Sequence, residues 1–352
     1  FYQIAIQSAQ VFQLLFRPWQ FLGITFFQSI SSAAITIGLM IWIGMGFQSY
    51  FIGFSIGALF SALVGWWMAR DYVDWSASNI KLWPRIMKFG LPLVPANLLF
   101  YVLDTSDRWF LGFYHGGLAI GVYAVGVKIT LAIGLVVEPF RKAWNPLAMK
   151  SLQQNESHAF FSFMARLYMG VGVAAVVILT AFSSTLIKWV TLPTYHNAYK
   201  VVGLLAWKQL FYGFFVVSAL GIYKKEKTKL IALISGLTSI LNVTLLYFWV
   251  PKYAEVGAAF AIVISFFVWN LFALAISYKL WPIHFPWAIL LGQILMGLFA
   301  TGILILSFDK GLGVLEISLF TGVSSAILLG SSVPFHHLKN WYKDVIIEGK
   351  MR

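Results

Sequence analysis

The strongest constraint on this chain is a succession of long apolar runs separated by short polar connections. A helix needs about 20 apolar residues to cross the roughly 30 Å core of a bilayer. The two-residue alternation of an outer-membrane barrel does not run through these segments. The sequence therefore predicts an all-α polytopic membrane protein with ten complete transmembrane helices. They span residues 20–43, 47–69, 89–113, 117–140, 165–189, 200–223, 229–250, 255–278, 286–307 and 312–333.

Composition agrees with lipid as the natural solvent. Hydrophobic residues make up 60% of the chain and charged residues only 11%, against about 25% charged residues in soluble domains. The chain has no cysteine, which excludes disulfides and thiolate metal sites. No histidine pair has metal-ligand spacing beside a carboxylate, and no glycine-rich phosphate loop precedes a Lys-Ser or Lys-Thr pair. We expect no metal, no cofactor and no soluble enzyme.

The basic residues predict the orientation of the chain in the membrane. With the 70–88 connection on the cytoplasmic side, 18 of the 25 Lys and Arg residues fall on that side and four on the other. This asymmetry is typical of multi-pass proteins of the plasma (cell inner) membrane and predicts a cytoplasmic C-terminus. It also explains the net charge of +13 without nucleic acid as a partner.

Charged residues inside the predicted spans are the first candidates for a functional site, because charges at this depth are costly. Asp104, Asp107 and Arg108 lie in the third span, Lys128 in the fourth and Lys208 in the sixth. At 1.5 Å per residue, Asp104, Lys128 and Lys208 all lie about 15–16 Å from the outer side. The surplus of cations favours a cavity that receives an anionic ligand. An internal network of ion pairs that holds helices together is the alternative.

Aromatic and proline residues near these charges complete the predicted site. The two tryptophans could stack on sugar rings or pack against other helices. The prolines could mark bending segments or, at the start of the third span, ordinary helix initiation. These residues are Trp109, Trp207, Pro92, Pro95 and Pro139.

A short internal similarity links two segments, Ile56–Ser61 and Val256–Ala261. Each is predicted to open a span after an outer loop, and six spans separate them. A duplicated six-helix unit would give this spacing. Chance is the alternative, because Gly-Ala-aromatic runs are common in membrane helices.

Five motifs in order carry a family resemblance. They are Phe89–Pro95, Asp104–Gly112, Gly121–Tyr123, Lys128–Ile129 and Ala143–Pro146. Together they resemble the polysaccharide-transport (Wzx-type) O-antigen and oligosaccharide flippases of the MOP superfamily, which also contains MATE drug exporters and MurJ lipid II flippases. The resemblance is best over 85–150 and continues more loosely to about 335.

The resemblance implies two six-helix, MATE-like bundles around a central cavity. On that plan the chain is N-terminally truncated, and residues 1–16 are the tail of an earlier helix. Residues 17–70 are the last two helices of the N-terminal bundle, and 71–280 form the C-terminal six-helix bundle. Residues 281–335 are two extra helices, and 336–352 form a cytoplasmic tail.

The resemblance also implies a function, which is to move an undecaprenyl-diphosphate-linked oligosaccharide repeat unit across the membrane. The product would be O-antigen, capsule or exopolysaccharide. The Asp107-Arg108 motif and Lys128 are carried over from the family, whereas Lys208 follows from its depth. Asp104 and Asp107 would orient these cations or bind a coupling cation. Membrane lipids and the polysaccharide polymerase or export machinery are the other expected partners.

Three other functions fit the sequence less well. A MATE-type cation exporter would favour an anionic cavity, whereas these spans carry a surplus of cations. A lipid II flippase would share most of the chemistry. A membrane polysaccharide polymerase would need acids or long loops on the outer side, where the acids are Glu255 and Asp309.

Overall fold

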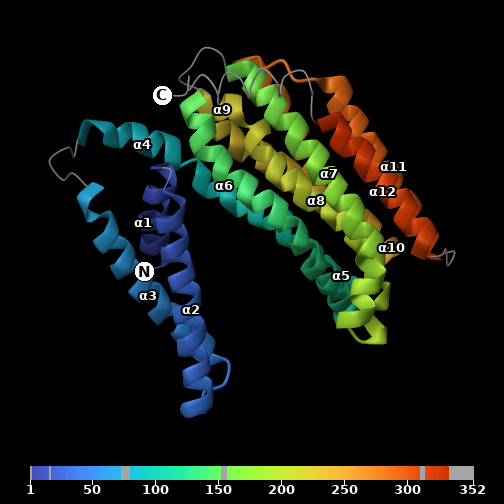
Figure 1. The fold of residues 1–352 in the computed structure, drawn as a ribbon, viewed down its shortest axis with the longest axis horizontal. Helices are drawn as coiled ribbons and strands as arrows, with labels where there is room; N and C mark the ends of the chain where they lie inside the picture. The colour runs from blue at the N-terminus through green and yellow to red at the C-terminus, as the bar shows by residue number, and fades with distance from the viewer. Residues whose placement is uncertain (1, 16, 73–79, 152–156, 310–313, 333–352) are drawn as a thin grey trace. The chain divides into compact units, whose positions relative to one another are not determined.

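A computed structural model describes residues 2–15, 17–72, 80–151, 157–309 and 314–332, and in these ranges all regular structure is helical (Figure 1). Seven helices or joined helices are long and apolar enough to cross a membrane, so the chain is a multi-pass helical membrane protein. The predicted tail 336–352 lies outside the described residues. The α-helices are α1 (Tyr2–Leu14), α2 (Pro18–Trp42), α3 (Gln48–Ala69), α4 (Trp83–Gly90), α5 (Leu93–Thr130), α6 (Gly134–Ser151), α7 (Ser157–Val190), α8 (Tyr199–Ser218), α9 (Leu220–Lys224), α10 (Lys229–Leu280), α11 (Trp287–Asp309) and α12 (Val314–Ser332).

The chain folds into two units, Phe1–Trp83 and Pro84–Arg352. In the first unit, small residues recur every four positions along α3, at Gly53, Gly57, Ser61 and Gly65. A Cβ atom at Gly57 would lie 2.7 Å from backbone atoms of Ser32 on α2, so the two helices touch through their backbones. Van der Waals contacts from such close packing hold the helices together, because the hydrophobic effect does not drive helix association within lipid.

Two helices of the second unit are interrupted by single residues with positive φ. Gly116 has φ 76° within α5, and Ala254 has φ 45° within α10. Both interruptions fall where the sequence predicts a connection between spans. The seven candidate spans therefore include segments of 66 and 52 residues, Trp83–Ala148 and Lys229–Leu280.

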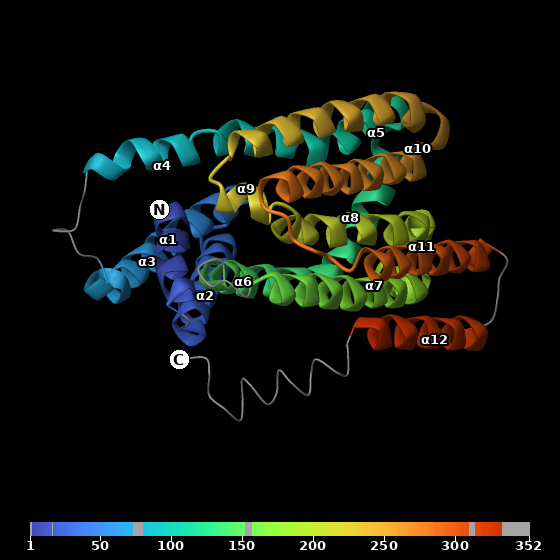
Figure 2. The ribbon, with the colours of Figure 1, turned by 90° about the horizontal axis from the view of Figure 1, so that it is seen from above.

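Helices α5, α8 and α10 pack together in the second unit, and α7 packs on α8 on one side and on α11 and α12 on the other (Figures 1 and 2). Buried polar side chains join these helices. Asn242 Nδ2 donates to the Leu103 carbonyl at 3.2 Å and to Ser106 Oγ at 3.0 Å, and Asn270 Nδ2 donates to the Phe211 carbonyl at 2.9 Å. Hydrocarbon offers these groups no other partner, so such bonds hold the helices in register.

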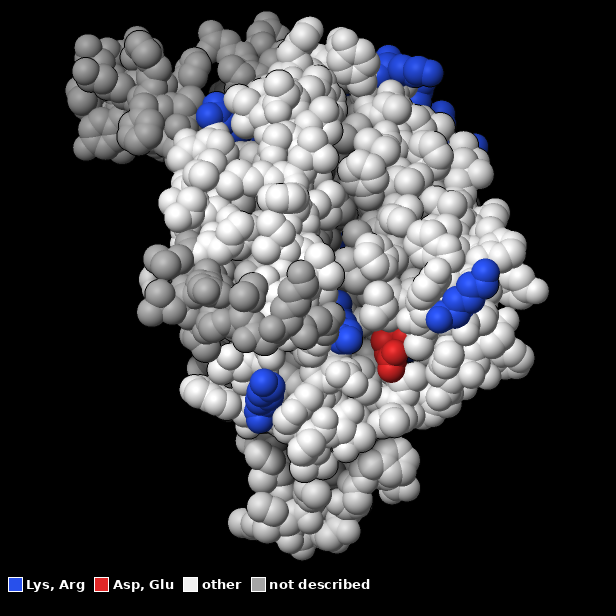
Figure 3. Space-filling view, turned by 90° about the vertical axis from the view of Figure 1, so that its right-hand side faces the viewer, with Lys and Arg blue, Asp and Glu red and all other residues white. Residues whose placement is uncertain are grey.

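The outer surface is largely apolar. Figure 3 shows one face on which charged side chains are few and widely spaced. Among the described residues, many large aromatic and aliphatic side chains are exposed, including Phe113 on α5 and Phe299 on α11. A surface of this kind is suited to contact with lipid rather than water.

The structure differs from the sequence prediction at the fourth predicted span, and it also places the prolines of the predicted site. The predicted span 117–140 is broken by a 3₁₀ turn at Leu131–Ile133 and then continues as α6 to Ser151. Pro139 lies inside α6 and is exposed. Pro92 is the N-cap of α5 and Pro95 lies in its first turn, so this pair marks the junction between α4 and α5.

The two segments of internal similarity lie at different places within their helices. Gly57 lies well inside α3, which begins at Gln48, whereas Gly257 follows closely on the break at Ala254. A Cβ atom at Gly257 would lie 2.6 Å from the Trp249 carbonyl, so this glycine permits the tight turn itself. Gly57 therefore lies nine residues after the first residue of its helix, whereas Gly257 lies three residues after the break.

Candidate functional site

The first element of the candidate site is an ion pair between two helices. Lys208 Nζ on α8 contacts Asp104 Oδ1 on α5, and the two side chains are 15% and 33% exposed. The ammonium also lies 5.3 Å from the centre of the Phe266 ring on α10. Asp104 and Lys208, which the sequence places at a similar depth, are therefore in direct contact. The four-residue spacing also places Asp104 and Arg108 on one face of α5, but the ion pair that Asp104 forms is with Lys208 on α8.

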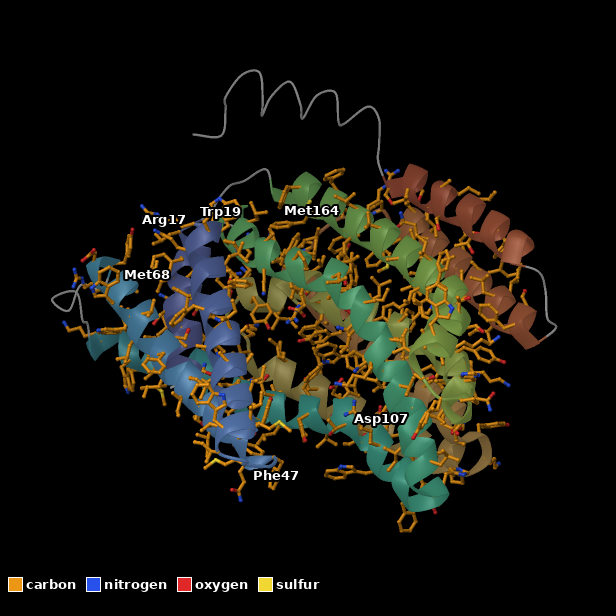
Figure 4. The ribbon with its side chains drawn as sticks, turned by 60° about the horizontal axis from the view of Figure 1, so that its bottom comes forward. Arg17, Trp19, Phe47, Met68, Asp107 and Met164 are labelled. Atoms are coloured by element: carbon orange, nitrogen blue, oxygen red, sulfur yellow. The ribbon has the colours of Figure 1, made fainter. Side chains whose placement is uncertain are left out.

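Asp107 forms a second, fully buried arrangement (Figure 4). Its Oδ2 accepts a hydrogen bond of 2.5 Å from the Tyr123 hydroxyl, and its Oδ1 accepts one of 2.8 Å from the Arg108 backbone N–H. Tyr123 lies beyond the interruption at Gly116, so this bond joins the two halves of α5. The contact also shows that these halves run back alongside each other.

Two predicted cations have no ionic partner among the residues that the structure describes. Arg108 is half-buried and Lys128 is exposed, and neither lies within 4.0 Å of a described carboxylate. Asp104 forms its ion pair with Lys208, while the carboxylate oxygens of Asp107 accept hydrogen bonds from the Tyr123 hydroxyl and a backbone N–H. The spans therefore retain a positive surplus after their internal pairs are counted, as the sequence analysis predicted.

The two tryptophans have different surroundings. Trp109 is 71% exposed on α5. Trp207 is fully buried, and its indole N–H donates to Thr301 Oγ1 on α11 at 3.1 Å. Trp207 therefore packs between helices, and the sequence-based assignment of this residue to the substrate site is not carried forward.

A further charged and aromatic group surrounds Tyr212, one helical turn from Lys208, and is not among the site residues predicted from the sequence. Arg141 on α6 forms a 2.9 Å ion pair with Glu138, and its guanidinium lies 4.3 Å from the centre of the Tyr212 ring. Tyr212 is one helical turn from Lys208 on α8 and lies 5.6 Å from the Phe100 ring on α5. The four-residue spacing of Lys208 and Tyr212 was a usable signal, whereas the position of Arg141 depends on the path of α6.

This fold and charge distribution define a class: a multi-pass helical membrane protein with cations inside its predicted spans, one of which, Lys208, joins two packed helices. Residues 1–152 match the sequence model of a family described as "Polysaccharide biosynthesis protein". This match includes the segment 85–150, where the resemblance to polysaccharide-transport flippases is best. The resemblance inferred from the motifs is thereby confirmed.

Two individual proteins are also similar. The "Lsg locus putative protein 1" of Haemophilus influenzae is 24% identical over 164 residues, which cover 42% of this chain and 40% of that protein. A solved structure of "Lipid II flippase MurJ, inward closed conformation" matches with a TM-score of 0.60 and 19% identity. That match covers 95% of this chain and 70% of the MurJ chain, and it shows similarity of fold.

Proposed function

We propose that this protein moves a polyprenyl-diphosphate-linked oligosaccharide across the bacterial inner membrane for the synthesis of a cell-surface polysaccharide. The observation that carries the proposal is the pair of intramembrane cations, Arg108 and Lys128, without described ionic partners. A diphosphate is a dianionic group that binds Arg and Lys through charge-assisted hydrogen bonds. The polysaccharide family match over residues 1–152 supports a sugar-linked substrate.

In this mechanism the head group meets Arg108, Lys128 and Lys208, while the lipid tail stays in the bilayer. Asp104 holds Lys208 between α5 and α8 until phosphate competes for the ammonium. Trp109 is exposed beside Arg108 and offers a surface for a sugar ring. Asp107 fixes the two halves of α5 through Tyr123, so the cations on either side of the Gly116 turn keep their spacing.

The transport cycle would use alternating access, with ten membrane crossings and a cytoplasmic C-terminus. A helix of 66 residues would be about 100 Å long if straight, roughly three times the bilayer core. The positive-φ residues Gly116 and Ala254 divide these segments, and the pieces from Leu93 to Gly116 and from Lys229 to Ala254 are each about one crossing long. The excess of Lys and Arg on one side of these crossings supports the orientation.

Gene deletion with lipid analysis tests the function. We expect a completed polyprenyl-diphosphate oligosaccharide to accumulate on the cytoplasmic leaflet, where mass spectrometry identifies it and a membrane-impermeant reagent does not reach it. Accumulation on the outer leaflet would indicate a polymerase instead. Unchanged lipids together with new drug sensitivity would indicate a cation exporter. A trapped peptidoglycan precursor would identify a lipid II flippase.

Site variants connect the function to the residues. Arg108→Ala and Lys128→Ala should abolish transport in the complemented deletion strain, with membrane levels of the protein unchanged. Lys188→Ala, which removes an exposed cation near the end of α7, is the matched control and should transport normally. Normal transport by both site variants would refute the cationic site.

A further inference from the structure

A groove at the start of α5 and α10 contains none of the charged or aromatic residues proposed to meet the head group. It has a volume of about 430 Å³ and is lined by Leu91, Pro92, Val94, Pro95, Lys229 and Ala232. Five of these six residues are uncharged, and the sixth is an exposed lysine at the first position of α10. An apolar groove with a cation at its rim has the polarity of a lipid site, with space for an acyl chain below a charged head group.

Basic residues lie near Lys229, which marks the rim of the groove. Lys88 on α4 and Lys225 and Lys227 in the connection before α10 are exposed, like Lys229. In the sequence of residues 84–95 and 224–232, the only acidic residue is Glu226. Arg85 already engages Glu226 through two hydrogen bonds, of 3.1 Å from Nε and 2.5 Å from Nη2. The remaining four lysines therefore give the rim a net positive charge.

Two contacts fix the rim to the groove. Thr228 Oγ1 donates to the Phe89 carbonyl at 2.7 Å, which joins the end of α4 to the start of α10. The Arg85–Glu226 pair makes a second link between the same segments. Ile86 and Met87 on α4 are exposed apolar side chains, so α4 presents both cations and apolar groups, as helices at a membrane interface do.

We propose that this groove binds one acidic phospholipid of the surrounding membrane, with its phosphate at Lys88 and Lys229 and an acyl chain against Pro92, Val94 and Ala232. Charge complementarity selects an anionic lipid over a zwitterionic one. The basic side of the chain is where juxtamembrane lysines meet anionic lipid heads. The site is independent of the proposed transport function, since it requires only that the chain is embedded in a membrane.

The test measures binding of defined lipids to the purified full chain in detergent. Added dioleoyl-phosphatidylglycerol should raise the thermal midpoint and give bound-lipid peaks in native mass spectrometry, whereas dioleoyl-phosphatidylcholine should not. Lys88→Gln and Lys229→Gln should each weaken phosphatidylglycerol binding about fivefold. Lys252→Gln, at an exposed position just before the break at Ala254 and far from the groove along α10, is the charge control and should bind normally.

A second pair of variants tests the groove without changing charge. Val94→Trp should fill the groove and abolish selective binding, and it should be tolerated because Val94 is 57% exposed. Ile240→Trp, at an exposed α10 position outside the groove lining, should have no effect. Equal binding of the two lipids, or phosphatidylglycerol binding that survives both Val94→Trp and Lys229→Gln, would overturn the proposal. Undecaprenyl phosphate is the competitor in a last experiment. If it displaces phosphatidylglycerol from the wild type but not from Val94→Trp, and Val94→Trp still binds phosphatidylglycerol, the groove would instead be assigned to a polyprenyl tail.

Discussion

The Asp104–Lys208 pair allows the structural and transport roles of an intramembrane charge to be separated. Asp104→Asn and Lys208→Met each remove one charge at similar side-chain size and leave the other charge without its partner. Two unit charges about 4 Å apart attract by roughly 4 kcal/mol at an effective dielectric constant of 20, whereas fully exposed pairs contribute about 0.2–1 kcal/mol. With Lys208 15% and Asp104 33% exposed, we expect a coupling energy between these limits, at about 1–3 kcal/mol.

The assay is a double-mutant cycle on the full chain in detergent, followed by denaturant titration. Each single variant should lose about 2 kcal/mol of unfolding free energy, and the double variant should lose less than the sum of the two. Purely additive losses would refute the reasoning that the pair is shielded from solvent.

Transport by the same three variants distinguishes the two roles of Lys208. If the lysine contacts the head group, the double variant recovers stability and stays inactive. If the double variant transports normally, the pair only holds α5 against α8, and Lys208 does not belong to the substrate site.

Three further predictions follow from contacts elsewhere in the chain. Asn242→Leu should lower the unfolding free energy by about 1 kcal/mol, measured by denaturant titration, because it removes interhelical bonds to α5; unchanged stability would contradict the bonding described. Gly57→Leu should destabilise the first unit by about 1–3 kcal/mol, because its side chain would meet the backbone at Ser32, and accelerated proteolysis between α2 and α3 would report it. The Arg85 guanidinium lowers the pKa of the Glu226 carboxyl, so this pair should stabilise the fold above the ordinary glutamate pKa and lose its effect as pH falls through the lowered value. A pH series of thermal midpoints should show this loss in the wild type and not in Glu226→Gln.

The sequence by itself determined the class of protein, because the physical requirement is local. A helix must satisfy its own backbone hydrogen bonds in lipid and span a fixed thickness, so runs of about 20 apolar residues predict helices wherever they occur. The interruptions at Gly116 and Ala254 lie at predicted connections for the same reason. The intramembrane charges were also found from the sequence, since any charge within such a run is exceptional.

Only the tertiary structure decided which of these charges are paired. The sequence placed Asp104, Lys128 and Lys208 at a similar depth without saying which of them meet, and the packing of α8 against α5 pairs Asp104 with Lys208. Trp207 and Trp109 are both next to a cation in sequence, yet one is buried against Thr301 and the other is exposed. Helix packing sets these outcomes, because a side chain's partners depend on the rotation and crossing of neighbouring helices, and a single apolar run carries little information about either.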